Sequence, residues 1–154
     1  TKVCAKKNIK LIYFSTNYVY PGTKGNYKEI DPVKPVNNYA WSKLGGEASV
    51  HLYKNSLILR VCMTEKPFVH KKAYKNAKTS FLYQDDVAKI LFKLIDKKGI
   101  INIGGKSMFI YDFAKKDNQN VKKIFLKKGL NKFPLNSSIN STKLKTLLKS
   151  NKRS

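Results

Sequence analysis

Two pairs of polar residues near the start of the sequence have the types and the spacing needed for proton transfer. Tyr39 and Lys43 stand four residues apart in "NNYAWSKLGGEA", so a helix would place them on one face, about 6 Å apart along its axis. A phenol is a poor acid at neutral pH, and a neighbouring ammonium improves it because it stabilises the phenolate. Ser15 and Thr16 end the apolar run "IKLIYFST" with hydroxyls that can donate to a carbonyl oxygen. Each pair alone is a weak signal in a chain so rich in lysine and tyrosine.

The elements around these residues predict an α/β fold in which the two pairs meet. "IKLIYFS" shows no alternation of apolar and polar residues, which predicts a strand buried on both faces, as in a parallel sheet. We expect a helix from Asn38 to about Tyr53, and two more strands at "SLILRVC" and "GIINIGG". Active sites of open α/β sheets lie beyond the carboxyl ends of the strands. Residues 17–38 are long enough to bring the helix back to that edge.

The second half of the chain predicts shorter elements. Residues 63–79 are polar and predict an irregular loop, and "TSFLY" predicts a short strand before a helix whose first turn, "QDD", is acidic. "SMFIYDFAKK" predicts a helix capped by Ser107, "VKKIFL" a short strand, and "NSTKLKTLLK" a helix capped by Ser141 or Thr142. These are too few strands for a complete doubly wound domain, so we expect the chain to be the second part of a larger fold.

The composition fits a domain with a real core in a reducing compartment. The chain has 154 residues, of which 42% are hydrophobic. No apolar run approaches the roughly 18 residues that cross a bilayer, so we expect no membrane partner. The two cysteines, Cys4 and Cys62, have no metal-ligand spacing around them, and we expect no bound metal. Together these features predict a cytoplasmic protein.

The formal charge of +23 comes almost entirely from lysine, because Arg60 and Arg153 are the two arginines. Proteins that read nucleic-acid sequence depend on arginine for bidentate contacts with bases and usually gather charge on one face. Here lysine is spread from one end of the chain to the other and accompanies abundant asparagine and isoleucine. We therefore expect nucleic acid to bind only non-specifically and in a salt-sensitive way.

The segment "YFSTNYVYPGTKGNYKEIDPVKPVNNYAWSKLGGE", residues 13–47, resembles the extended short-chain dehydrogenase/reductase family, most closely its dTDP-4-dehydrorhamnose reductase branch. The likeness extends to "LILR", "YQDDVAKILFKLI" and "GIINIGGKSMFIYDFAKK". It implies part of a Rossmann-like doubly wound parallel sheet, without its N-terminal half, and a small C-terminal substrate-binding region. Residues 1–62 would hold the second half of the Rossmann-like domain. Residues 63–154 would form the substrate-binding and closing region, interleaved with the sheet.

The resemblance also implies a reaction, the NAD(P)H-dependent reduction of a 4-keto nucleotide sugar. Tyr39 would give a proton to the keto oxygen, Thr16 would orient that oxygen, and Lys43 would hold the nicotinamide ribose and make the phenol more acidic. The residues bordering the cofactor, NADPH or NADH, would be Ser15, Tyr39, Lys43 and Cys62. The residues bordering the nucleotide-sugar substrate would be Thr16, Asn17, Arg60 and His70. A homodimer is compatible with the resemblance.

Two departures from the family pattern keep other functions open. The glycine-rich phosphate turn G-x-x-G-x-x-G is absent, so we expect this chain alone to have little affinity for a dinucleotide. Asn17 stands where family members often have aspartate. Related dehydratases place an Asp-Glu pair after the Ser/Thr residue, and Asn17 and Tyr18 argue against that activity here. A nucleotide-sugar epimerase, and a non-catalytic regulatory or binding homologue that lacks the cofactor-binding half, remain the alternatives.

Overall fold

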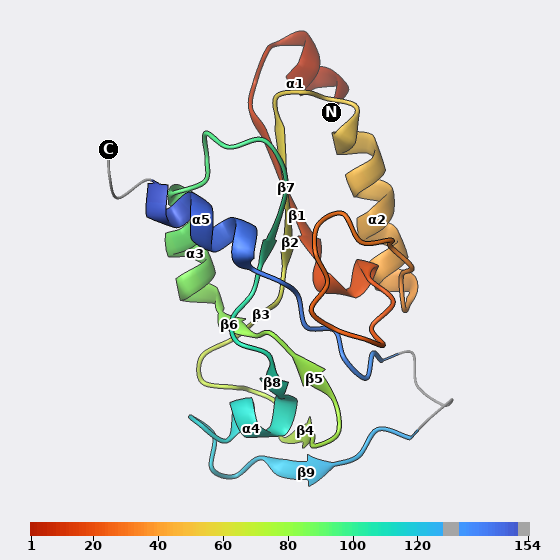
Figure 1. Ribbon diagram of the computed structural model, residues 1–154, viewed down its shortest axis with the longest axis vertical. Coiled ribbons are helices and arrows are strands. Elements are labelled where there is room, and N and C mark those ends of the chain that lie inside the picture. The colour runs from red at the N-terminus through yellow and green to blue at the C-terminus, as the bar shows by residue number, and fades with distance from the viewer. Residues whose placement is uncertain (128–132, 151–154) are drawn as a thin grey trace.

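The computed structural model describes residues 1–127 and 133–150 and is built on a parallel sheet of three strands (Figure 1). The strands are β1 (Leu11–Thr16), β2 (Ser56–Val61) and β7 (Gly99–Ile103), in the order β1-β2-β7. Their register places Ser15 beside Arg60 and Arg60 beside Asn102. All three carboxyl ends therefore meet at one edge of the sheet, as the sequence predicted.

The strands differ in burial because of their places in the sheet. β2 is central, and all six of its residues are buried. In β1, the residues from Leu11 to Phe14 are only partly buried, and Ser15 and Thr16 are buried. The prediction that β1 is buried on both faces is therefore wrong for its first four residues. Among the described residues, β1 is an edge strand that pairs with β2 alone, so its apolar side chains keep some contact with solvent.

Helices cover both faces of this sheet (Figure 1). α2 (Asn38–His51) packs against β1 and β2, while α3 (Gln84–Phe92) and α5 (Thr142–Ser150) lie on the opposite face. A short helix, α1 (Lys2–Lys6), precedes β1. The main core lies between the sheet and the second pair of helices; its buried members are Leu57, Leu59, Val61, Val87, Leu94, Ile101, Ile103 and Leu144. This is a Rossmann-like α/β arrangement with parallel strands.

A smaller region of short strands lies beyond the carboxyl ends of the sheet (Figure 1). Its pairs are β3 (Met63–Thr64) with β6 (Leu82–Tyr83), β4 (Lys72–Tyr74) with β9 (Lys122–Ile124), and β5 (Lys78–Thr79) with β8 (Met108–Phe109). Together with α4 (Ile110–Ala114), this region has a core of its own around Phe68 and Phe113. The prediction of an irregular loop for residues 63–79 is wrong, because three short strands lie within it.

Two predicted caps also differ from the structure. Ser107 does not cap α4, because Met108 and Phe109 pair with β5 and delay the helix until Ile110. Ser141 precedes α5, but its hydroxyl donates to the carbonyl oxygen of Gly104 at 2.7 Å instead of capping the helix. In both cases the residues near the predicted cap contact a part of the chain that is distant in sequence.

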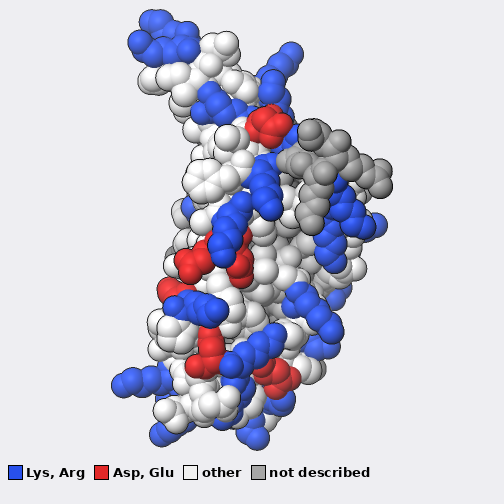
Figure 2. All heavy atoms as spheres, turned by 90° about the vertical axis from the view of Figure 1, so that its left-hand side faces the viewer, with Lys and Arg blue, Asp and Glu red and all other residues white. Residues whose placement is uncertain are grey.

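Charged side chains are spread over the surface. On the face shown in Figure 2, lysines occur from one end of the molecule to the other, with acidic side chains between them. They do not gather into one continuous patch on this face. In the described part of the chain, no helix is both long and apolar enough to cross a membrane.

Candidate active site

A pocket of about 210 Å³ opens at the carboxyl end of β1. Its wall includes Ser15, Thr16 and Asn17 from the end of the strand and Tyr39 from the first turn of α2. Thr16 is buried, whereas Tyr39 is 55% exposed. The structure therefore brings the threonine hydroxyl and the phenol to one pocket, although the loop of residues 17–38 separates them in sequence.

The first turn of α2 is held by a cap and by packing. The side chain of Asn37 accepts a hydrogen bond from the N–H of Ala40 at 2.9 Å, which satisfies one of the free donors of the helix start. Ala40 itself is fully buried. This anchoring leaves the neighbouring Tyr39 free to face the pocket.

Lys43 lies one turn further along α2 and contacts Tyr13 of β1. Its ammonium lies 4.9 Å from the centre of the Tyr13 ring, and the Tyr13 hydroxyl donates to the Lys43 carbonyl at 3.2 Å. Gly46 makes this approach possible, because a Cβ at that position would lie 2.1 Å from the Tyr13 hydroxyl oxygen. Lys43 is thus placed beside the helix face that carries Tyr39, and it is not part of the wall of the small pocket.

Asn17 connects the carboxyl edge of the sheet to Ser137, in the segment that precedes α5. Its side-chain amide donates to the carbonyl oxygen of Ser137 at 2.9 Å and lies 3.4 Å from the hydroxyl of Thr79. The Thr16 hydroxyl donates to the side-chain oxygen Oδ1 of Asn17 at 3.4 Å and accepts from the N–H of Tyr18 at 3.3 Å. Asn17 therefore lines the pocket and is itself held in place by Ser137 and Thr79.

Arg60 belongs to a buried ion pair with Glu47, and the Ser15 side chain is bonded to the same carboxylate although Ser15 also lines the small pocket. Arg60 donates to both carboxylate oxygens of Glu47 on α2, with the shortest contact at 2.7 Å, and both side chains are 5% exposed. The Ser15 hydroxyl donates to the same carboxylate. Arg60 also donates to the Tyr20 hydroxyl at 2.8 Å. Burial opposes the charge of Arg60, but the hydrogen bonds with Glu47 outweigh it and raise the pKa of Arg60. The expected contact of Arg60 with substrate is therefore wrong, because its guanidinium is buried against Glu47.

Cys62 is likewise committed to the protein interior. Its N–H donates to the Ile103 carbonyl at 2.9 Å, and its own carbonyl accepts from the N–H of Leu82 at 3.0 Å. Its sulfur lies 3.0 Å from the Thr79 hydroxyl oxygen. Burial raises the pKa of the Cys62 thiol to about 11. Both backbone groups are therefore satisfied, which leaves no free group of Cys62 for the expected cofactor contact.

A larger pocket of about 720 Å³ adjoins the small one in the region of short strands. The two pockets share five wall residues, which are Tyr18, Met63, Thr64, Glu65 and Phe81. Aromatic rings form much of the larger wall, with Phe133 in contact with both Tyr18 and Tyr74. His70 lines this pocket and touches Phe68 edge-on, and Lys71 and Lys72 follow it. His70 therefore lines the larger pocket, and its contact with a substrate stays a prediction.

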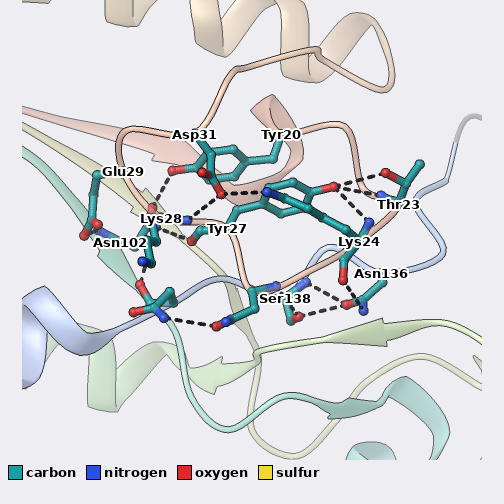
Figure 3. A network of polar contacts seen from close by, with 12 residues as sticks. Tyr20, Thr23, Lys24, Tyr27, Lys28, Glu29, Asp31, Asn102, Asn136 and Ser138 are labelled. Carbon is teal, nitrogen blue, oxygen red and sulfur yellow. Dashed lines mark hydrogen bonds and ion pairs between the residues drawn. The ribbon is translucent and has the colours of Figure 1, made fainter.

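The loop between Thr16 and Tyr39 is anchored to β7 and to the C-terminal segment (Figure 3). Tyr20 and Tyr27 stack with their ring centres 4.9 Å apart. The Tyr20 hydroxyl donates to Asn102 of β7, whose amide donates in turn to the Tyr27 carbonyl. The N–H of Tyr27 donates to the Ser138 carbonyl at 3.1 Å. This network fixes the path by which the chain returns α2 to the edge of the sheet.

The sequence also matches a known protein family. Residues 1–98 match the model of the RmlD substrate binding domain family. The chain belongs to the RmlD substrate binding domain family.

Individual relatives point to the same group of proteins. "Probable low-salt glycan biosynthesis reductase Agl14" of Haloferax volcanii is 43% identical over 61 residues, which are 38% of this chain and 20% of that protein. The dTDP-4-dehydrorhamnose reductase of Burkholderia thailandensis is 52% identical over 40 residues, 25% of this chain and 13% of that protein. The matched segments thus span a fifth or less of the length of these relatives.

Solved structures extend the likeness to almost the whole chain. A hypothetical dTDP-4-dehydrorhamnose reductase from Sulfolobus tokodaii superposes with a TM-score of 0.79 at 30% identity, over 94% of this chain and 61% of that one. A UDP-glucuronic acid 4-epimerase from Bacillus cereus, solved in complex with a UDP sugar and NAD, gives 0.76 at 25% identity, over 96% and 58%. This member of the RmlD family therefore corresponds to about three fifths of the solved chains.

Some pocket residues of this RmlD family member were missed in the sequence. Tyr18 lies beside the predicted Asn17, so the motif itself could have indicated it. Glu65 directly follows β3. If the sequence had indicated this two-residue strand, the rule that sites lie beyond strand ends would have pointed to Glu65. The aromatic wall comes from residues far apart in sequence, and no local pattern joins them.

Proposed function

We propose that this chain is the catalytic and substrate-binding part of an NAD(P)H-dependent reductase of a 4-keto nucleotide sugar, similar to dTDP-4-dehydrorhamnose reductase. The observation that carries the proposal is that Thr16 and Tyr39 line one pocket while Lys43 lies one helical turn from Tyr39. Membership of the RmlD family and the names of its relatives support the reaction class.

The two adjoining pockets suit the two parts of a nucleotide sugar. The large pocket offers aromatic faces, on which a base can stack, and the ammonium groups of Lys71 and Lys72, which attract phosphates. The small pocket is lined by hydroxyl, amide and phenol groups, which suit a sugar. The sugar would therefore lie nearest Tyr39, with the nucleotide extending into the region of short strands.

Within the small pocket each polar residue has a distinct role. The hydroxyl of Thr16 orients the keto oxygen by turning its one proton from the long 3.4 Å contact with the Asn17 side-chain oxygen to the substrate. The exposed phenol of Tyr39 gives its proton to the same oxygen, so that a carbonyl becomes a hydroxyl. The ammonium of Lys43 then stabilises the negative charge that remains on the phenol oxygen. Tyr13, which contacts Lys43 through its ring, restrains this ammonium close to α2.

When NADPH or NADH is bound, it supplies the hydride that is added to the keto carbon. Of the four residues expected to border it, Tyr39 and Lys43 fit, because a hydroxyl and an ammonium one turn apart can hold the two hydroxyls of a ribose. Ser15 and Cys62 do not fit, because their polar groups are occupied by Glu47, Ile103 and Leu82. Of these four residues, the two that fit a cofactor contact both lie on α2.

We also propose the division expected from the sequence, with residues 1–62 carrying the catalytic groups and residues 63–154 the substrate region. An epimerase is the second candidate, since the Bacillus cereus 4-epimerase has the same fold at a TM-score of 0.76. A reductase consumes one NAD(P)H for each sugar, whereas an epimerase returns its cofactor unchanged. Measuring the absorbance of NADPH at 340 nm with a 4-keto sugar separates the two.

The decisive test is Tyr39→Phe in the protein that contains this chain. We expect ketosugar reduction to fall at least about 100-fold, because general acids contribute roughly 10²–10⁴-fold. Tyr53→Phe is the matched control; its hydroxyl is buried with no hydrogen-bond partner among the described residues, and it lines neither pocket. Unchanged turnover in Tyr39→Phe would remove Tyr39 from the mechanism.

A further inference from the structure

Glu65 holds a carboxylate at the junction of the two pockets. It follows β3 directly and lines both the large and the small pocket. Its side chain is exposed, and Thr64 donates to one of its oxygens at 3.2 Å. In the part of the chain that the structure describes, no lysine or arginine forms an ion pair with it. The neighbouring Lys66 instead places its ammonium 5.3 Å from the centre of the Tyr83 ring.

The charges around the two pockets are arranged unequally. Lys71, Lys72 and His70 line the large pocket and are absent from the wall of the small one. Apart from Glu65, the residues that line the small pocket are neutral. Negative charge on a ligand is therefore favoured in the large pocket and disfavoured at the junction, even though the whole chain carries a formal charge of +23.

We propose that Glu65 determines substrate specificity by accepting hydrogen bonds from the hydroxyl groups of a neutral sugar and excluding a sugar that carries a carboxylate. This inference rests on the proposed function, because it assumes that the sugar of a nucleotide sugar lies near Tyr39. An ionised carboxylate accepts hydrogen bonds and donates none, so sugar hydroxyls satisfy it. A uronic acid would place a second carboxylate in the junction, where like charges repel and no hydrogen bond compensates.

The proposal separates this chain from structural neighbours that have the same fold. The 4-epimerase from Bacillus cereus is named for UDP-glucuronic acid, which is an acidic sugar nucleotide. Overall similarity therefore does not decide between neutral and acidic sugars. Glu65 decides between neutral and acidic sugars, because the two classes differ by one charged group that would lie near its carboxylate.

The test is to titrate the protein that contains this chain with dTDP-glucose and with dTDP-glucuronic acid, which differ only at C6, by isothermal calorimetry. We expect the neutral ligand to bind at least about tenfold more tightly, a ratio that corresponds to about 1.4 kcal/mol. In Glu65→Gln the ratio should fall to about threefold or less, mainly because the acid binds more tightly. Glu65→Asp should preserve the preference.

Asp96→Asn is the control for net charge, because Asp96 is exposed and lies outside both pockets. It should leave the ratio unchanged. Equal affinity of the wild-type protein for the two ligands, or an unchanged ratio in Glu65→Gln, would overturn the role of Glu65 and leave the proposed function standing. Failure of both ligands to bind the wild-type protein would instead count against the nucleotide-sugar site itself, and the role of Glu65 would fall with it.

Discussion

Glu47→Gln should destabilise the fold strongly, because it leaves Arg60 charged and buried without its carboxylate. The two side chains are each 5% exposed, and three hydrogen bonds join them, the shortest at 2.7 Å. Removing one partner of a buried ion pair typically costs about 3–5 kcal/mol, since the other charge has already lost its hydration. A glutamine oxygen can still accept one hydrogen bond, so we expect a loss of about 3 kcal/mol in the free energy of unfolding.

Asp96 and Lys97, which are adjacent in sequence and joined by one contact, form an exposed ion pair that serves as a control. Its nitrogen–oxygen distance is also 2.7 Å, but its side chains are 65% and 27% exposed. Exposed pairs contribute about 0–1 kcal/mol because water solvates both charges. Asp96→Asn should therefore cost much less than Glu47→Gln. The comparison isolates burial as the cause.

Urea unfolding followed by circular dichroism at 222 nm measures both losses. With a urea dependence of about 2 kcal/mol per molar, a loss of 3 kcal/mol lowers the midpoint by about 1.5 M. The slope of the transition should not change. A double variant, Glu47→Leu with Arg60→Met, should recover most of the stability, because it removes both buried charges. If Glu47→Gln lowers the midpoint no more than Asp96→Asn does, burial of the Glu47–Arg60 pair does not make it important for stability.

Adjacent glycines of α2 should respond in opposite directions to alanine. Gly45→Ala should stabilise the protein by up to about 1 kcal/mol, because no atom lies within 4 Å of the new Cβ and alanine favours a helix. Gly46→Ala should instead cost about 1–3 kcal/mol, because its Cβ would lie 2.1 Å from the Tyr13 hydroxyl oxygen. Tyr13→Ala in the same protein should relieve that cost. Thermal unfolding measures all three variants, and equal effects of Gly45→Ala and Gly46→Ala would refute the contact. Burial raises the pKa of Cys62 from 9.0 to about 11, so the folded state holds this proton more tightly. The corresponding stability, up to about 3 kcal/mol, is present below pH 9 and is lost as the pH rises toward 11. The stability of the wild type relative to Cys62→Ala should therefore decline over that range, and a constant difference would contradict the assignment.

The main elements that carry the site could be predicted because each has a strong local pattern. The run that became β1, the helix from Asn38 and the strands around Leu57 and Ile101 all occur where the sequence indicated. Parallel strands then imply one shared carboxyl edge, so the meeting of Thr16 and Tyr39 followed from topology. Membership of the RmlD family agrees with the resemblance seen in the same residues.

The region of short strands could not be predicted, because two-residue strands have no period to detect. β4 pairs with β9 across about 50 residues of sequence, and β5 pairs with β8 across about 30. Such pairings depend on the whole fold and not on local sequence. Glu65 was missed for the same reason, since its position at a strand end exists only once β3 and β6 have paired.

Arg60 shows most clearly why a charge in an apolar run needs its partner before its role can be assigned. The segment "SLILRV" is completely buried, and a charge there must be compensated. A bound substrate could supply the opposite charge, and the family resemblance implied a substrate contact for Arg60, but a carboxylate from a packed helix could supply it as well. Glu47 supplies it, and Glu47 lies on the same helix as Tyr39, about 12 Å further along the axis. The ion pair therefore contributes to the site by fixing where α2 lies, so a substitution of Arg60 should act on the position of Tyr39 rather than on a direct contact with substrate.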